Sequence, residues 1–299
     1  MKSSIVQGDK TMESEIDFAI IGGSGLYSMP ALSAIKEVEV NTPFGKPSAP
    51  IKIGSLGGRR VAFLARHGIG HHISPTEVNY RANILAVKIL GVDRIVSISA
   101  CGSLKEDYAP GDIVIPDQLF DFTHLRPRTF FGDGLVAHVG AADPFCGDWS
   151  AQVFDSAQKA GANVHAGGKL ITIEGPRFST KAESQIFRSW GLSIIGMTAS
   201  PEAFLAREAE ICYATMAHVT DYDVWHVSME PVSVDMVIKT LNKNTAIAQD
   251  AIRLLAENFR AGTECSCQHA LASALITNRE FIPQETREKL NPLIGKYIP

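Results

Sequence analysis

The sequence predicts a single α/β domain in which helices flank a central mixed β-sheet. Short apolar runs of strand character alternate with amphipathic stretches of helical spacing along most of the chain. No internal repeat, low-complexity segment or linker divides it. Its 299 residues, 45% apolar and 20% charged, are enough for one large globular domain. We therefore expect one domain over residues 13–299, ending in a helical tail, and a disordered polar extension over residues 1–12.

The expected strands are short runs rich in apolar and β-branched residues. They cover residues 16–21, 51–55, 61–65, 94–99, 112–115, 169–173, 192–195 and 211–219. Gly57 and Gly58 lie between the second and third runs and predict a hairpin. Helical spacing predicts helices at residues 75–90, 144–160, 181–190, 201–210 and 232–259. Ser74 is the expected N-cap of the first helix, and Gly91 marks its end.

Charge and composition argue against several classes of partner. The net charge of −4 gives no general attraction to nucleic acid or to an anionic membrane, so any anion site must be local. No apolar run is long enough to span a bilayer, and the N-terminus has no apolar secretory segment. We expect neither a nucleic-acid nor a membrane partner.

The cysteines predict a reduced, cytoplasmic protein. There are five, an odd number, at positions 101, 146, 212, 265 and 267. Cys265 and Cys267 are separated by one residue and have too few neighbouring ligands in the sequence for a structural zinc site. Two free thiols in a tail are the favoured interpretation, and a disulfide or redox pair is the alternative.

Polar or glycine-rich residues follow six of the expected strands. These segments are residues 22–25, 66–68, 99–102, 174–178, 196–198 and 220–223. In α/β sheets, ligands bind in the crevice beyond the carboxyl ends of the strands. Hydroxyls, a guanidinium, an imidazole, an aromatic ring and carboxylates would therefore meet in one site.

Two of these segments are suited to an anion. The glycine-rich turn 22–25 is either a tight turn or an anion cradle to which Ser24 adds a hydroxyl. It is not a dinucleotide fingerprint, because Ser28 stands where the third glycine belongs. Arg66 and His67 offer a planar donor fork beside an imidazole, suited to one phosphate, although a surface ion pair is the alternative for Arg66. Ser99 and Thr198 would complete a cup without a carboxylate.

Other cofactor chemistry has little support in the sequence. His67, His71 and His72 lie among glycines that break the helix on which a zinc-binding pair would sit. There is no Walker motif, and no cysteine has the partners of a protease-type nucleophile. We expect no metal and no cofactor.

Aromatic and apolar residues suggest how an organic ligand would be held. Phe178 follows a rigid turn and could stack on a flat heterocycle, although core packing is the commoner fate of phenylalanine. Val234, Val237 and Ile238 form one stripe of a helix, for which core packing is again the alternative.

Two carboxylates end the last strand. Asp221 and Asp223 are either cap and turn residues or groups that handle protons on a bound molecule.

Seven stretches together resemble the S-methyl-5'-thioadenosine phosphorylase family, within the purine nucleoside phosphorylase superfamily. They are residues 21–26 (IGGSGL), 65–68 (ARHG), 78–84 (VNYRANI), 100–104 (ACGSL), 110–115 (PGDIVI), 173–179 (IEGPRFS) and 220–223 (TDYD). The likeness runs from about residue 18 to about residue 255 and is specific because the motifs occur in order.

The resemblance implies a purine nucleoside phosphorylase-like fold and a homotrimer, which some members pair into a hexamer. The phosphate site of the family falls on Ser24, Arg66, His67, Ser99, Ala100 and Thr198. Its nucleoside contacts fall on Phe178, Met197, Asp221 and Asp223, and its 5'-methylthio pocket falls on Val234, Val237 and Ile238. His138 matches a position that reaches into the site of a neighbouring subunit, and Ser179 and Val234 match positions tied to substrate preference.

The implied reaction is reversible phosphorolysis of S-methyl-5'-thioadenosine to adenine and 5-methylthioribose 1-phosphate, a pentosyl transfer in purine and methionine salvage. Inorganic phosphate is then a co-substrate. Adenine leaves readily only when its N7 is protonated or strongly hydrogen-bonded, so a carboxyl group kept protonated by burial can act as general acid. Asp221 is the candidate acid. Asp223 would orient it or accept from the 6-amino group, a donor that requires an acceptor opposite it.

Three alternatives remain open at this point. A broader purine nucleoside phosphorylase would also accept adenosine or inosine. A methylthioadenosine nucleosidase would use water, which does not need the Arg66–His67 pair. A non-catalytic purine-binding protein would need neither the paired carboxylates nor the phosphate cup.

Overall fold

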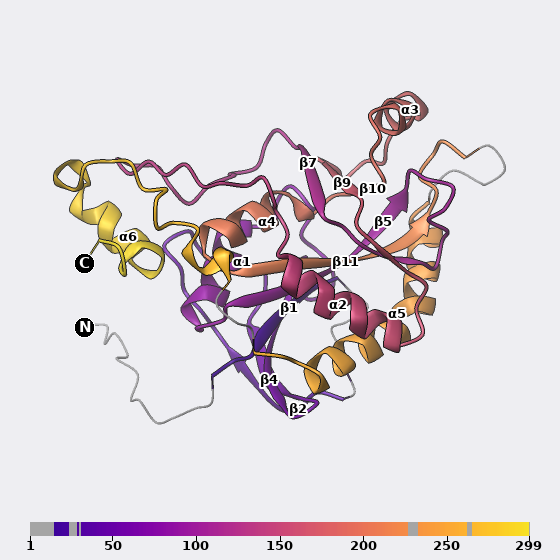
Figure 1. Ribbon diagram of the computed structural model, residues 1–299, viewed down its shortest axis with the longest axis horizontal. Coiled ribbons are helices and arrows are strands. Elements are labelled where there is room, and N and C mark those ends of the chain that lie inside the picture. The colour runs from indigo at the N-terminus through magenta and orange to yellow at the C-terminus, as the bar shows by residue number, and fades with distance from the viewer. Residues whose placement is uncertain (1–14, 24–28, 30, 227–232, 262–264, 299) are drawn as a thin grey trace.

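The central sheet passes through the molecule with helices on both of its faces (Figure 1). The computed structural model describes residues 15–23, 29, 31–226, 233–261 and 265–298, except for the side chains of residues 236 and 241–244. The expected N-terminal extension and Ser24 lie outside the described residues. The expected α/β architecture with a mixed sheet is confirmed.

The sheet combines parallel and antiparallel pairs. Its order is β2-β3-β4-β1-β5-β10-β9-β7, and β11 branches from β5 toward β6 and β8. The strands are β1 Phe18–Gly22, β2 Ser33–Val38, β3 Ile51–Leu56, β4 Arg59–Ala65, β5 Arg94–Ser103, β6 Ile113–Ile115, β7 Gln118–Phe122, β8 Val164–Ala166, β9 Lys169–Ile173, β10 Ile194–Gly196 and β11 Cys212–Asp221. β1 runs parallel to β4 and β5, and β2 to β4 form an antiparallel meander.

Alternate residues of the central strands face the two helical layers. The helices are α1 Tyr80–Ile89, α2 Gly147–Lys159, α3 Lys181–Ser189, α4 Ala199–Glu208, α5 Val234–Glu257 and α6 Gln284–Ile294. On β1, Ala19 and Ile21 pack with α1 and α4, whereas Phe18 and Ile20 pack with α2 and α5. All residues of β1 and β11 are buried, because both strands are covered on both faces.

A crevice forms along one edge of β5. β11 follows the other edge from Arg94 to Gly102. On the first edge, β1 pairs with residues 95–97 and β10 pairs with residues 102–103. Between these registers, residues 98–101 have no partner strand on that edge in the described part of the chain. Ligands bind at such points of divergence in α/β sheets.

Most predicted elements are confirmed within a few residues. The hairpin is confirmed: β3 and β4 pair antiparallel, and Gly57 and Gly58 both have positive φ. Strands β2, β7 and β8 were not predicted. β2 is mostly exposed, β7 is half-buried or exposed and β8 has three residues, so none shows a clear apolar period.

Three predicted boundaries are wrong. The first helix begins at Tyr80, not near residue 75, because Asn79 caps it by accepting from the Ala82 N–H at 3.2 Å. Ser74 instead donates its hydroxyl to Glu77. Residues 99–102 do not follow a strand but belong to β5, and Asp221 is still within β11, where a register shift lies between Val219 and Asp221.

The tail contains 3-10 helices at Ser266–His269 and Arg279–Phe281 before α6. The expectation that Cys265 and Cys267 lack neighbouring ligands is wrong. Folding brings Cys146 and Cys212 beside them, and all four sulfur atoms lie within 4.8 Å of one another. No helix in the described ranges is both long and apolar enough for a membrane span.

Candidate active site

A cavity of about 570 Å³ opens at the crevice along β5. Most of the residues selected from the sequence line it. They are Arg66, His67, Ser99, Ala100, Phe178, Ser179, Met197, Thr198, Asp221, Asp223, Val234, Val237 and Ile238. The segments that carry them are far apart in the sequence, so the fold creates the site by bringing strand ends and one helix together.

Two of the selected residues are not seen in this cavity. Ser24 lies outside the described residues, although Gly23 beside it lines the cavity. His138 is exposed and does not line the cavity of its own chain; its N–H donates to the Ala274 carbonyl. Its contact with a neighbouring subunit stays a prediction.

Arg66 is a buried connector at the floor of the cavity. Its Nε and Nη2 atoms donate to the carboxylate of Glu202 at 2.8 and 2.9 Å. Its Nη1 donates to the Ile98 carbonyl at 3.2 Å, and Nη2 also reaches Ser97. Burial disfavours the charged form, but Glu202 keeps the pKa of Arg66 above its usual value.

This geometry means that the guanidinium of Arg66 binds a protein carboxylate and is not free to bind a phosphate with both of its donor arms. The surface ion pair is ruled out, because Arg66 is 1% exposed. The fork itself faces Glu202, so only the second N–H of Nη1 has no partner among the described residues. Sequence reasoning missed Glu202, since an acidic residue in the first turn of a helix is ordinary.

His67 presents a neutral ring to the cavity. Its Nδ1 lies 2.9 Å from the Ile73 carbonyl, which can only accept, so Nδ1 carries the hydrogen. Burial and the charge of Arg66 lower the pKa of His67 to about 4. At neutral pH, Nε2 therefore carries a lone pair with which it can accept a hydrogen bond from a ligand.

Thr198 closes the same side of the cavity. It stands before α4, whose backbone is interrupted at Ser200, and its side chain makes no capping hydrogen bond, so the hydroxyl remains available to a ligand.

Asp221 is held by polar groups in an otherwise apolar setting. Its Oδ1 accepts from the N–H of Asp223 at 2.7 Å, and Oδ2 lies 2.7 Å from the hydroxyl of Thr220. That hydroxyl also lies 3.2 Å from the Cys101 carbonyl. Burial nevertheless raises the pKa of Asp221 to about 6. When Asp221 is protonated, its Oδ2–H can donate a hydrogen bond to the Thr220 hydroxyl. That hydroxyl in turn donates to the Cys101 carbonyl, so the neutral form of Asp221 is fully hydrogen-bonded.

Asp223 lies next to Asp221 with one oxygen unused. Its backbone has φ +50°, a conformation that aspartate tolerates and that directs its N–H onto Asp221. Its Oδ2 is buried and has no hydrogen-bond partner among the described residues. Burial raises the pKa of Asp223. The cap interpretation is wrong, because neither carboxylate caps a helix in the described part of the chain. The turn interpretation is confirmed in part: residues 223–225 form a turn, and Asp221 accepts from the N–H two residues further on, but both carboxylates also line the cavity.

Comparison with known proteins agrees with this geometry. The profile of the phosphorylase superfamily matches residues 17–257. The S-methyl-5'-thioadenosine phosphorylase of Koribacter versatilis is 54% identical over 287 residues, covering 96% of this chain and 98% of the relative. That of Geobacter sulfurreducens is 53% identical over 280 residues, covering 93% and 98%. The chain belongs to the S-methyl-5'-thioadenosine phosphorylase family.

Solved structures of the family have the same fold. A methylthioadenosine phosphorylase from an antarctic soil metagenomic library superimposes with a TM-score of 0.89 at 48% identity, covering 93% of this chain and 99% of that one. The methylthioadenosine phosphorylase of Schistosoma mansoni, determined in complex with adenine, gives a TM-score of 0.82 at 38% identity, covering 87% and 97%.

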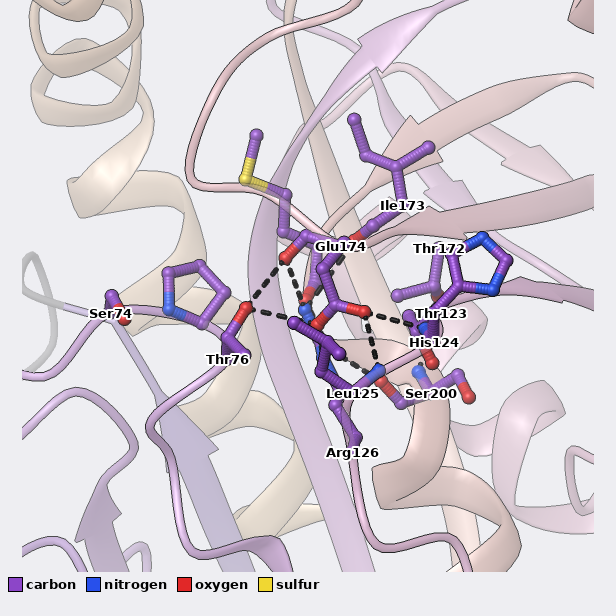
Figure 2. A network of polar contacts seen from close by, with 12 residues as sticks. Ser74, Thr76, Thr123, His124, Leu125, Arg126, Thr172, Ile173, Glu174 and Ser200 are labelled. Atoms are coloured by element: carbon purple, nitrogen blue, oxygen red, sulfur yellow. Dashed lines mark hydrogen bonds and ion pairs between the residues drawn. The ribbon is translucent and has the colours of Figure 1, made fainter.

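A polar network fixes the loop that carries Phe178. Figure 2 shows Glu174 at its centre: the carboxylate accepts from Thr76 and from the backbone N–H groups of His124 and Leu125. Burial disfavours ionisation, but these donors lower the pKa of Glu174 to about 2. The network ties the end of β9 to segments far along the chain.

Arg126 completes this network and was missed from the sequence. Its Nε donates to Glu174 at 3.0 Å, and its Nη1 donates to the carbonyls of Met197 and Ser200 at 2.7 Å each. It therefore holds the segment that carries Phe178 against the segment that carries Met197, and both residues line the cavity. Its only sequence signal is a basic residue in a polar loop.

The apolar stripe of α5 lines the cavity and does not belong to the core. Val234 is 60% exposed and Ile238 is 49% exposed, and neither is part of a core cluster. Core packing is therefore excluded as the reason for this stripe.

We predict that Arg126→Gln raises KM for the nucleoside at least about tenfold and lowers thermal stability. Loss of the guanidinium leaves the buried carbonyl of Ser200 without its donor, which costs about 1–3 kcal/mol. Steady-state kinetics and thermal unfolding measure both effects.

The control is Arg128→Gln, two residues along the same segment. Arg128 is half-exposed and pairs with Asp121 at 3.0 Å, so its loss should change neither quantity much. Equal effects of the two substitutions would refute the positioning role of Arg126.

Proposed function

We propose that this protein catalyses the reversible phosphorolysis of S-methyl-5'-thioadenosine to adenine and 5-methylthioribose 1-phosphate. It is then a pentosyltransferase of purine and methionine salvage. One observation carries the proposal: a single cavity has an anion-binding side at Arg66, His67 and Thr198 and a pair of buried carboxylates at Asp221 and Asp223. The relatives at 50% identity or more that carry this activity in their names support the same substrate.

The anion side is suited to inorganic phosphate as co-substrate. Ser99, Ala100 and Thr198 provide hydroxyl and backbone donors, and Ser24 is proposed to join them. Because the His67 ring is neutral with Nε2 as an acceptor, we assign it the P–OH of a monohydrogen phosphate. Phosphate then lies beneath C1' of the ribose, where it attacks as the purine leaves.

The carboxylate side is suited to an adenine. Asp221 has a pKa near neutrality and is the proposed general acid for N7; donation requires its carboxyl group to turn from Thr220 to the purine. The unpaired Oδ2 of Asp223 is the proposed acceptor for the 6-amino group. Phe178 and Met197 line the cavity and are the proposed apolar contacts of the purine, and Ser179 lies close to Asp223. A 6-oxo group would instead leave that oxygen without a donor.

The far end of the cavity is suited to a methylthio group. Val234, Val237 and Ile238 offer no hydrogen bond to a 5'-hydroxyl. Such an apolar pocket favours the thioether by a few kcal/mol at most, so adenosine remains a slower substrate.

Quaternary structure and location are also proposals. We propose a homotrimer, or a dimer of trimers, in which His138 reaches a neighbouring site. Apolar surface supports subunit contacts: Phe120, Leu125 and Trp190 are between 42% and 75% exposed. A cytoplasmic location is supported by the five cysteines, all of which are free.

We predict strict dependence on phosphate. Adenine release from S-methyl-5'-thioadenosine, followed with and without inorganic phosphate, should stop when phosphate is removed. Equal turnover in phosphate-free buffer would instead support the water-using nucleosidase, and binding without turnover would support a non-catalytic purine-binding protein.

His67→Asn should raise KM for phosphate about 10- to 100-fold, the value of a hydrogen bond to a charged group. An asparagine amide can still donate to the Ile73 carbonyl, so only the Nε2 contact is lost. His72→Asn is the matched control, because His72 has the same kind of bond, to the Ile69 carbonyl, but does not line the cavity. A rise in KM for the nucleoside alone would place His67 outside the phosphate site.

Asp221→Asn should slow adenine release by at least about 100-fold, as the loss of a general acid does, and relatively favour 6-oxopurine nucleosides. In the parent enzyme, kcat/KM at saturating phosphate should fall above about pH 6, and the variant should lose this limb. Asp223→Asn should keep the limb and mainly raise KM. An unchanged rate of adenine release in the Asp221 variant, or loss of the limb only in the Asp223 variant, would reverse the two roles.

Asp221→Asn should also increase the stability of the folded protein at high pH. Burial raises the pKa of Asp221 from 3.8 to about 6, so the folded protein holds a proton that the unfolded chain releases. Stability is thus lost as pH rises through this window, by at most about 3 kcal/mol for a shift of about two units. Asp221→Asn should therefore raise the melting temperature more at pH 8 than at pH 5. Equal shifts at both pH values would contradict the raised pKa.

A further inference from the structure

Four cysteine side chains converge at the end of the molecule opposite to the proposed active site. Cys212 is the first residue of β11 and Cys146 is the N-cap of α2, whereas Cys265 and Cys267 belong to the tail. Their sulfur atoms all lie within 4.8 Å of one another. Because β11 has ten residues, its two ends are roughly 30 Å apart, so this cluster is separate from Asp221.

The distances fit ligands of one small ion better than disulfides. All four thiols are free, and Cys146 and Cys265 approach to 3.7 Å, well beyond a bond between two sulfur atoms. In a tetrahedral zinc site with Zn–S bonds of about 2.3 Å, neighbouring sulfur atoms are about 3.8 Å apart. Small side-chain rotations would therefore bring the widest separations to this value.

The surroundings favour thiolates. Cys146 lies at the N-terminus of α2, where the helix dipole stabilises negative charge. Arg207 of α4 donates from Nη1 to the sulfur of Cys267 at 3.1 Å, which places one positive charge against a tetrathiolate.

The site is closed but has an access route. Cys146, Cys212 and Cys267 are buried, whereas Cys265 is half-buried. Three of the four cysteines line a surface hollow of about 680 Å³. Hydrogen bonds also hold the tail segment in place before any metal binds. The side-chain oxygen of Gln268 accepts from the Cys265 N–H, and its side-chain nitrogen donates to Asp93.

We propose that Cys146, Cys212, Cys265 and Cys267 bind one Zn²⁺ ion in a structural tetrathiolate site. Four sulfur ligands around one ion suit Zn²⁺ and leave no position for a substrate. The ion links the start of β11, the start of α2 and the C-terminal tail. Binding displaces the thiol protons, so affinity increases with pH. This proposal is independent of the reaction assigned to the cavity.

The test measures metal in the full-length protein, produced in zinc-supplemented medium and purified without oxygen in a non-chelating reductant. Elemental analysis by mass spectrometry should find about one zinc ion per chain. Cys265→Ser, Cys267→Ser and Cys146→Ser should each lower this content severalfold. Cys101→Ser is the control: Cys101 lies outside the cluster, so this variant should retain its zinc.

Three measurements on the parent protein cover the case in which a variant fails to fold. A mercurial reagent should release the zinc in step with the four cluster thiols, and denaturation in a chelator should expose five titratable thiols, the number in the sequence. Chelation should also lower the melting temperature of the parent protein.

Any of four results would overturn the proposal. Five free thiols with almost no bound metal would show an empty thiol cluster. Fewer than five thiols after denaturation would show disulfides instead. Iron or copper in place of zinc would also refute the assignment, as would full zinc content in the Cys265 and Cys267 variants.

Discussion

The buried ion pair between Arg66 and Glu202 connects the elements from which the cavity is built. Arg66 directly follows β4 and bonds to carbonyls of β1 and β5 through its guanidinium. Glu202 belongs to α4 and also accepts from Tyr213 of β11 at 2.8 Å. One pair thus links four strands, β1, β4, β5 and β11, to helix α4. Breaking such a pair would leave one buried charge without its partner, which is costly, so the floor of the cavity is rigid.

This arrangement separates the two sides of the proposed reaction electrostatically. The Arg66 charge is neutralised by Glu202, so it attracts an anion only weakly from a distance, yet it still lowers the pKa of His67. Asp221 and Asp223 line the same cavity, and burial raises the pKa of both carboxyl groups, which have no cationic partner among the described residues. The cavity therefore holds an uncharged imidazole beside the phosphate position and a proton-bearing carboxyl group beside the leaving group.

Sequence reasoning predicted the architecture because its signals are local. Alternation of strands and helices, the glycine pair of the hairpin and the apolar run of β11 depend on neighbours within a few residues. It also selected Asp221, Asp223, Phe178 and Thr198, since polar residues at strand ends meet at one edge of a sheet. It failed where a tertiary contact decides, as at Glu202 and Arg126, whose partners lie 136 and 48 residues away.

The stripe of Val234, Val237 and Ile238 has the same helical spacing whether it faces a core or a cavity, so only the position of α5 settles the matter. The cysteines show the same division. The sequence by itself determined that the chain has an odd number of thiols and two of them close together in the tail. Only the tertiary structure decided that Cys146 and Cys212 lie beside them, because the partners of a side chain depend on how distant segments pack, which residue spacing does not encode.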